Sequence, residues 1–136
     1  MSGARVEPVD ADRATACALV DQARAHLGSA RTSGVDAESA YGLVYQAALK
    51  AMIAVLLAMG RRVTSGAGGH VVILREAARH LPGHEPLFTR LDTMRRARHA
   101  IFYEVDEVSD AELAGAMADA EQAIGLADTA VAGATP

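Results

Sequence analysis

The segment YGLVYQAALKAMIAVLLAMG, residues 41–60, contains the longest unbroken apolar run of the chain, Ala51–Met59. Ser33 or Asp36 is placed to begin a helix here, and Gly60 is placed to end it. Because the second half of the segment is apolar on nearly every side, we predict that this is the most buried helix. Apolar residues recur along it at the three- and four-residue spacing of one helix face, namely Tyr41, Val44, Ala48, Met52, Val55 and Met59.

Four more helices are predicted around this segment, over about residues 10–27, 69–81, 86–103 and 109–131. Gly28 is placed to end the first of them. Ser109, with Glu112 three residues later, has the pattern of a capping box at the start of the last. Five helices joined by short connections predict an all-α fold, an antiparallel up-and-down bundle of four to five helices.

The composition excludes several classes of protein. Alanine accounts for 30 of the 136 residues and tryptophan is absent, which favours helix and argues against a β-sandwich or barrel. With 51% hydrophobic and 22% charged residues the chain suits one packed domain, expected over residues 1–136 with frayed ends at about 1–8 and 132–136. A net charge of −4 argues against broad nonspecific binding of nucleic acid but leaves room for a local basic site.

The sequence also gives expectations about location. The longest apolar run has nine residues, well short of the roughly 20 that cross a bilayer, so no membrane association is expected. The first residues lack the apolar core of a secretory signal. Cys17 is the only cysteine and is expected to be a small buried core residue. We therefore expect a cytoplasmic protein.

The predicted helix over residues 86–103 has one residue that does not fit its apolar face. Leu87, Leu91, Met94 and Ile101 share a stripe, and Arg98 lies in the middle of it. Burying an unpaired guanidinium costs several kcal/mol, so Arg98 must be paired, reach a cleft or extend its charged end to water along apolar surface.

The opposite face of the same helix is polar and carries Asp92, Arg96, His99 and Tyr103. For Arg96 a surface position is the simpler interpretation, because arginines late in a helix complement its macrodipole. At 100° per residue Arg98 and Tyr103 point about 140° apart, so we expect one chain not to bring them together easily.

The fragment RRARHAIFYE, residues 95–104, resembles the signature of the HEPN domain family (higher eukaryotes and prokaryotes nucleotide-binding). The resemblance covers residues 41–104 most clearly, and the Arg98-His99-x3-Tyr103 pattern is similar to a variant in small actinobacterial members. It implies an all-α bundle and a homodimer. Active members are metal-independent endoribonucleases whose Arg-x4–6-His elements from two chains meet in one cleft.

By this resemblance the catalytic residues are Arg98, His99 and Tyr103, and Arg95 and Arg96 bind RNA phosphate. Arg98 would stabilise the negative charge that develops on the scissile phosphate, and His99 would move the proton of the ribose 2′-OH. Tyr103 stands where nucleases have histidine. A tyrosine pKa near 10 suits a general base poorly, whereas a histidine pKa near 6.5 suits it well.

Two functions therefore stay open. The first is an RNA- or nucleotide-binding protein that acts as an endoribonuclease in a stress, defence or toxin–antitoxin system. The second is a non-catalytic dimeric module of the same fold, linked to DNA repair or defence. Under either, the resemblance implies a homodimer, with RNA or nucleotide and a protein such as an antitoxin or repair factor as further partners.

No metal site or cofactor is expected. The five histidines show no metal-ligand spacing. The glycine-rich run SGAGG, residues 65–69, precedes a predicted helix and has the composition of a phosphate-binding loop. It lacks the Gly-x-x-x-x-Gly-Lys pattern, and no strand is expected before it, so a plain helix–helix connection is the favoured interpretation.

Overall fold

The computed structural model describes residues 3–104 and 107–134. Over these residues the chain is all-α, 73% helical, with five helices and one two-stranded sheet. The elements in chain order are β1 (Val6–Pro8), α1 (Arg13–Ala30), α2 (Ala37–Ala58), β2 (Arg61–Val63), α3 (Gly69–His80), α4 (Glu85–Glu104) and α5 (Asp110–Ala132). The predicted helical bundle is confirmed.

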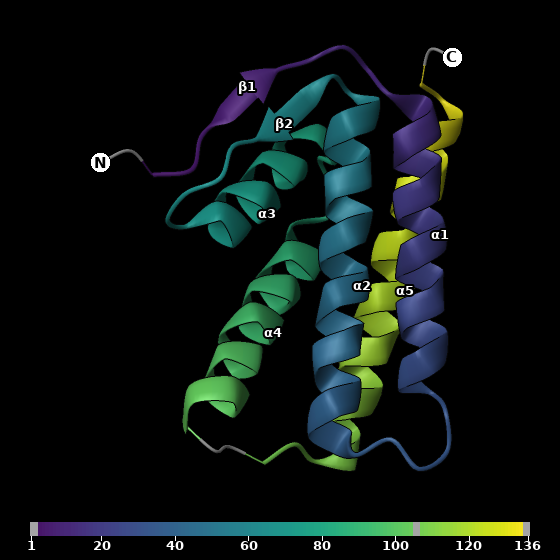
Figure 1. Cartoon of the computed structure of the whole chain (residues 1–136), viewed down its shortest axis with the longest axis vertical. Coiled ribbons are helices and arrows are strands. Elements are labelled where there is room, and N and C mark those ends of the chain that lie inside the picture. The colour runs from purple at the N-terminus through teal and green to yellow at the C-terminus, as the bar shows by residue number, and fades with distance from the viewer. Residues whose placement is uncertain (1–2, 105–106, 135–136) are drawn as a thin grey trace.

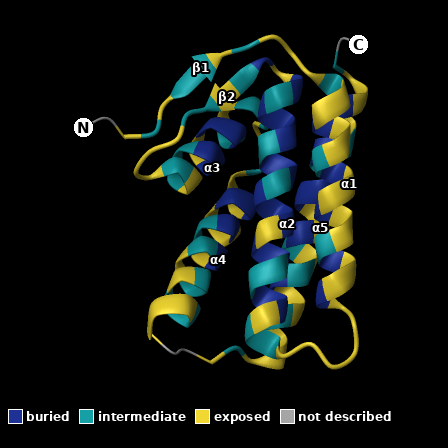
Figure 2. Ribbon diagram, viewed as in Figure 1, coloured by how far each residue is buried: buried dark blue, intermediate teal, exposed yellow. Residues whose placement is uncertain are grey.

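Helix α2 is the centre of the molecule, because α1, α3, α4 and α5 all contact it. Helices α1, α2 and α5 run side by side, while α4 slopes away from α2 toward its exposed end (Figures 1 and 2). Completely buried alanines make up much of the three-helix contact: Ala16, Ala23, Ala47, Ala51, Ala54, Ala120, Ala123 and Ala127. Because alanine side chains are small, these helices can pack with their axes close together.

The predicted helix signals have mixed outcomes. Asp36 caps α2 by accepting a hydrogen bond from the Ser39 backbone N–H (3.0 Å), and Gly60 follows its last turn. The capping box of Ser109 and Glu112 is present at α5, with both reciprocal bonds. Helix α1, however, continues past Gly28 to end at Ala30, so the predicted stop at Gly28 is wrong.

Three further expectations are corrected. Val6–Pro8, placed in the frayed N-terminus, forms strand β1 and pairs antiparallel with β2, so that Val6 lies opposite Val63. Cys17 is exposed rather than buried, because it lies beside the buried stripe of α1 and not on it. Ala132, at the start of the expected C-terminal fraying, is still helical, whereas residues 1–2 and 135–136 lie outside the described residues.

Among the described residues, α2 alone has the length and composition of a membrane-spanning helix. Of its most apolar 18-residue window, 61% is buried inside the molecule. The core helix of a soluble protein meets the same criteria, so this is weak evidence for a membrane span.

Candidate functional site

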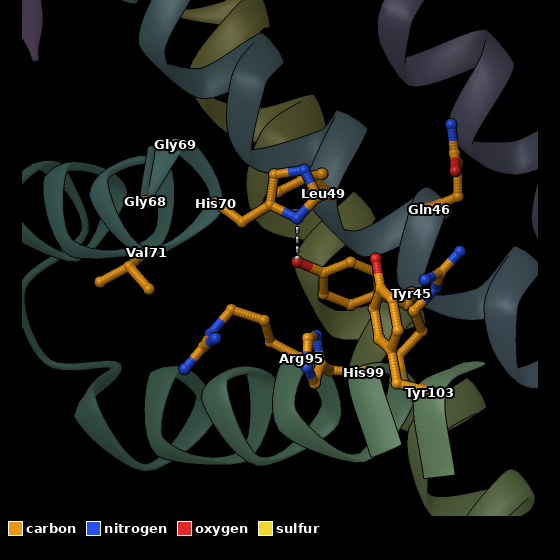
Figure 3. A pocket seen from close by; sticks show the side chains of 11 residues that line it. Tyr45, Gln46, Leu49, Gly68, Gly69, His70, Val71, Arg95, His99 and Tyr103 are labelled. Carbon is orange, nitrogen blue, oxygen red and sulfur yellow. Dashed lines mark hydrogen bonds between the residues drawn. The ribbon is translucent and has the colours of Figure 1, made fainter. Parts of the chain in front are cut away.

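A cavity of about 450 Å³ opens between α2, the start of α3 and the second half of α4. Its size lies within the range of roughly 300–1,000 Å³ that is usual for small-ligand clefts. Polar and aromatic side chains from three helices line it, namely Tyr45, Gln46, His70, Arg95, Arg98, His99 and Tyr103 (Figure 3).

Arg98 is half-buried and lines this cavity as well as a second hollow beside it. Leu87, Leu91 and Met94, on its side of α4, are buried as predicted. The Arg98 guanidinium lies over the Phe102 ring, 4.9 Å from its centroid, and no ion pair joins it to a carboxylate within residues 3–104 and 107–134. Of the three alternatives that the sequence left open for Arg98, the structure shows the side chain in a cleft.

The structure separates the two other arginines of the segment. Arg95 lines the cavity and donates from Nε to Asp92 Oδ1 at 2.9 Å. Arg96 is absent from the lining; its exposed side chain lies with Nε 3.3 Å from Asp92 Oδ2. The geometry thus places Arg95 beside the cavity with Arg98. Arg96 lies on the surface, as the simpler interpretation of the sequence predicted.

Tyr103 and His99 also line the cavity, and their ring centroids lie 4.4 Å apart. Arg98 lines the same cavity, so one chain places Arg98 and Tyr103 around one space, although we expected that it would not do so easily. Helical side chains lean toward the N-terminus, so the Tyr103 ring lies back against His99. The Arg98 guanidinium lies over Phe102, the residue next to Tyr103.

Two residues of the site were missed by sequence reasoning. Tyr45 of α2, which is buried, and His70 of α3, which is exposed, meet in the lining of the cavity, with 2.8 Å between Tyr45 Oη and His70 Nδ1 (Figure 3). Burial raises the pKa of Tyr45 to about 12, even though the charges of Arg95 and Arg98 act to lower it. Burial, followed by the charges of Arg98 and Arg95, lowers the pKa of His70. At neutral pH both side chains are uncharged.

The start of α3 forms another wall of the cavity. Gly68, with φ +76°, is the N-cap, and no side chain caps this helix. Gly68, Gly69 and His70 line the cavity, so the partial positive charge of the helix N-terminus faces the same space as Arg95 and Arg98. The glycine-rich run, interpreted from sequence as a plain connection, therefore also contributes to the site. The expectation that no strand would precede it is wrong, because β2 ends two residues before it.

The chemistry of this arrangement favours an anion. Two guanidinium groups and a helix N-terminus supply positive potential. Asp92 is shared by Arg95 and Arg96, and Glu38 lines the second hollow beside Arg98, so neither carboxylate lines the cavity itself. Within the described residues, no three His, Cys, Asp or Glu side chains are grouped so that they could hold a metal ion.

The chain was compared with known proteins at three levels. No protein-family model, no curated protein and no solved structure matches it.

Proposed function

We propose that the protein binds RNA or a nucleotide through phosphate, in the cavity between α2, α3 and α4. One observation carries this proposal: Arg95, Arg98 and the N-terminus of α3 line the same cavity. A guanidinium presents a planar set of donors that matches phosphate oxygens, and backbone N–H groups at a helix start complement the same charge.

The proposal includes the relationship to HEPN domains. It is supported by the all-α bundle, by the long apolar α2 with Gly60 after it, and by the position of Arg98 in a cavity. A homodimer belongs to the same proposal and follows from the resemblance. The placement of Arg98, His99 and Tyr103 around one cavity in a single chain means that a partner chain is not needed to assemble these three residues.

Metal-independent cleavage of RNA is a second candidate function, favoured by the two imidazoles in the cavity. His70, uncharged at neutral pH, would accept the proton of a ribose 2′-OH as its oxygen attacks phosphorus. Arg98 would stabilise the added negative charge. The bond to the 5′-oxygen would break, with His99 donating a proton to that oxygen, leaving a cyclic phosphate and a 5′-hydroxyl. His70 would thus supply the general-base imidazole that nucleases have at the position of Tyr103.

Binding is tested with a fluorescent single-stranded RNA of about ten nucleotides, by anisotropy in the presence of chelator. Arg98→Gln is expected to weaken binding about tenfold or more, because a hydrogen bond to a charged group is worth about 1.5–3 kcal/mol. Arg96→Gln is the matched control, since it removes the same charge from the same helix outside the cavity. Equal losses in the two variants would contradict a site in the cavity.

Cleavage is tested on the same RNA by following the appearance of cyclic-phosphate ends with chelator present. Under the second candidate, His70→Gln and Arg98→Gln abolish the product while Arg96→Gln keeps it. Binding with no product from the unsubstituted protein would eliminate the nuclease and leave the non-catalytic binding module.

A further inference from the structure

Two large aromatic side chains are exposed at the end of α4. Phe102 and Tyr103 have relative exposures of 65% and 66%, against 36% for Val35 and 41% for Met59, the other large exposed hydrophobics of the described residues. Their rings meet edge to face with centroids 4.8 Å apart. Exposed apolar surface that borders polar residues often marks a binding site, so we ask what ligand could cover this pair.

Each ring is already held by a neighbour on its own helix. The His99 ring lies against Tyr103, and the Arg98 guanidinium lies over Phe102. These contacts restrict the rings without burying them, so a planar ligand meets a partly ordered aromatic surface. Such preorganisation lowers the entropic cost of binding.

We propose that Tyr103 is a stacking platform for an unpaired nucleobase of the RNA or nucleotide whose phosphate Arg95 and Arg98 hold. This assignment rests on the proposed phosphate site, and it replaces the closing catalytic role that the resemblance implies for Tyr103. A nucleobase presents a π-face to an aromatic ring whatever its identity, so stacking gives affinity with little sequence preference.

Charge complementarity favours a nucleotide over a protein surface. Arg98 lines the cavity together with Tyr103 and lies over the ring of Phe102. An apolar protein partner covering both rings would remove water from this guanidinium without pairing it, which is costly. A nucleotide brings a phosphate for the arginine and a base for the ring at once. Two side chains are also a small part of the roughly 800 Å² per partner that a stable dimer interface buries.

Tyr103→Trp offers a direct probe, because the chain has no tryptophan of its own. The variant is titrated with a short single-stranded RNA and with an oligonucleotide of the same length and backbone whose sugars carry no bases. We expect the RNA to quench the tryptophan fluorescence and the abasic strand not to quench it. The exposure of position 103 allows the exchange without disturbing the core.

Affinity gives the second readout. The unsubstituted protein is expected to bind the RNA about tenfold more tightly than the abasic strand. Tyr103→Ala should remove this preference and keep the affinity for the abasic strand, whereas Tyr103→Phe should retain the preference. Met59→Ala, at an exposed apolar residue that does not line the cavity, is the control and should change neither affinity.

The outcomes separate the two proposals. If the abasic strand binds, loses affinity in Arg98→Gln and binds as tightly as RNA, phosphate binding stands and stacking is overturned. If neither strand binds, both fail. If Tyr103→Ala converts a dimer into a monomer in light scattering and leaves the base preference unchanged, the aromatic pair is an interface between two copies, and stacking is overturned.

Discussion

At the scale of single residues, the surroundings of His70 make the stability of the protein depend on pH. Burial, with the charges of Arg98 and Arg95, lowers the pKa of His70 from its ordinary value of 6.5. The unfolded chain therefore binds this proton more readily than the folded chain. The stabilising contribution is complete above about pH 6.5 and is lost as the pH falls toward the lowered pKa.

We expect His70→Gln to flatten the fall in the free energy of unfolding between pH 7.5 and 5, measured by urea denaturation at each pH. His26 has the same sign, because burial and the charge of Lys50 lower its pKa. His26→Gln should therefore remove a separate part of the slope, so that some pH dependence persists in His70→Gln. Identical slopes in His70→Gln and the unsubstituted protein would contradict the lowered pKa of His70.

At the scale of elements, the turn between α2 and β2 depends on Gly60. Its φ is +72°, and a Cβ there would lie 3.0 Å from the carbonyl oxygen of Val9. Gly60→Ala is expected to lower the free energy of unfolding by about 1–2 kcal/mol or more, since an L-residue is strained at this φ and the close approach adds to it. Urea denaturation measures the change.

Gly28→Ala is the matched control, because Gly28 lies within α1 and a Cβ there meets nothing within 4 Å. Because Gly28 lies in the last turn of α1, this exchange should not destabilise the protein and should stabilise it by no more than about 0.5 kcal/mol. Destabilisation of similar size in both variants would mean that loss of glycine, and not the conformation at Gly60, is responsible.

The elements also show which features of the fold and the site could be predicted from the sequence. Signals within a few residues, such as the capping box at Ser109 or the glycine after α2, predicted helix ends correctly. Arg98 could be identified from sequence because it is a charged residue within the apolar stripe of its helix. Strand β1 was missed because its three residues pair with a segment more than 50 residues away. Tyr45 and His70 were missed for the same reason: only the packing of α3 on α2 brings them together.

At the scale of the whole molecule, the close contact of α1, α2 and α5 leaves no space for larger side chains. Ala120 of α5 is completely buried, and Ala118 of the same helix is exposed. Ala120→Leu is expected to lower the free energy of unfolding by about 1–3 kcal/mol through overpacking, and Ala118→Leu to change it little. Thermal or urea denaturation compares them, and equal stabilities would mean that the alanine contact tolerates expansion.

If the protein binds RNA as proposed, the charge of the whole chain limits the number of phosphate contacts. With a net charge of −4, we expect attraction to RNA only at the cavity, which Arg95, Arg98 and the N-terminus of α3 line. Two phosphate contacts on single-stranded RNA give a slope of roughly −1.4 for the logarithm of the binding constant against the logarithm of salt concentration, because each contact contributes about −0.7.

Arg98→Gln should reduce the magnitude of this slope by about 0.7, and Arg96→Gln should leave it unchanged. Anisotropy titrations at several salt concentrations measure all three slopes. A slope near −4 or steeper in the unsubstituted protein would require phosphate contacts far outside the cavity and would contradict a site made of these two arginines.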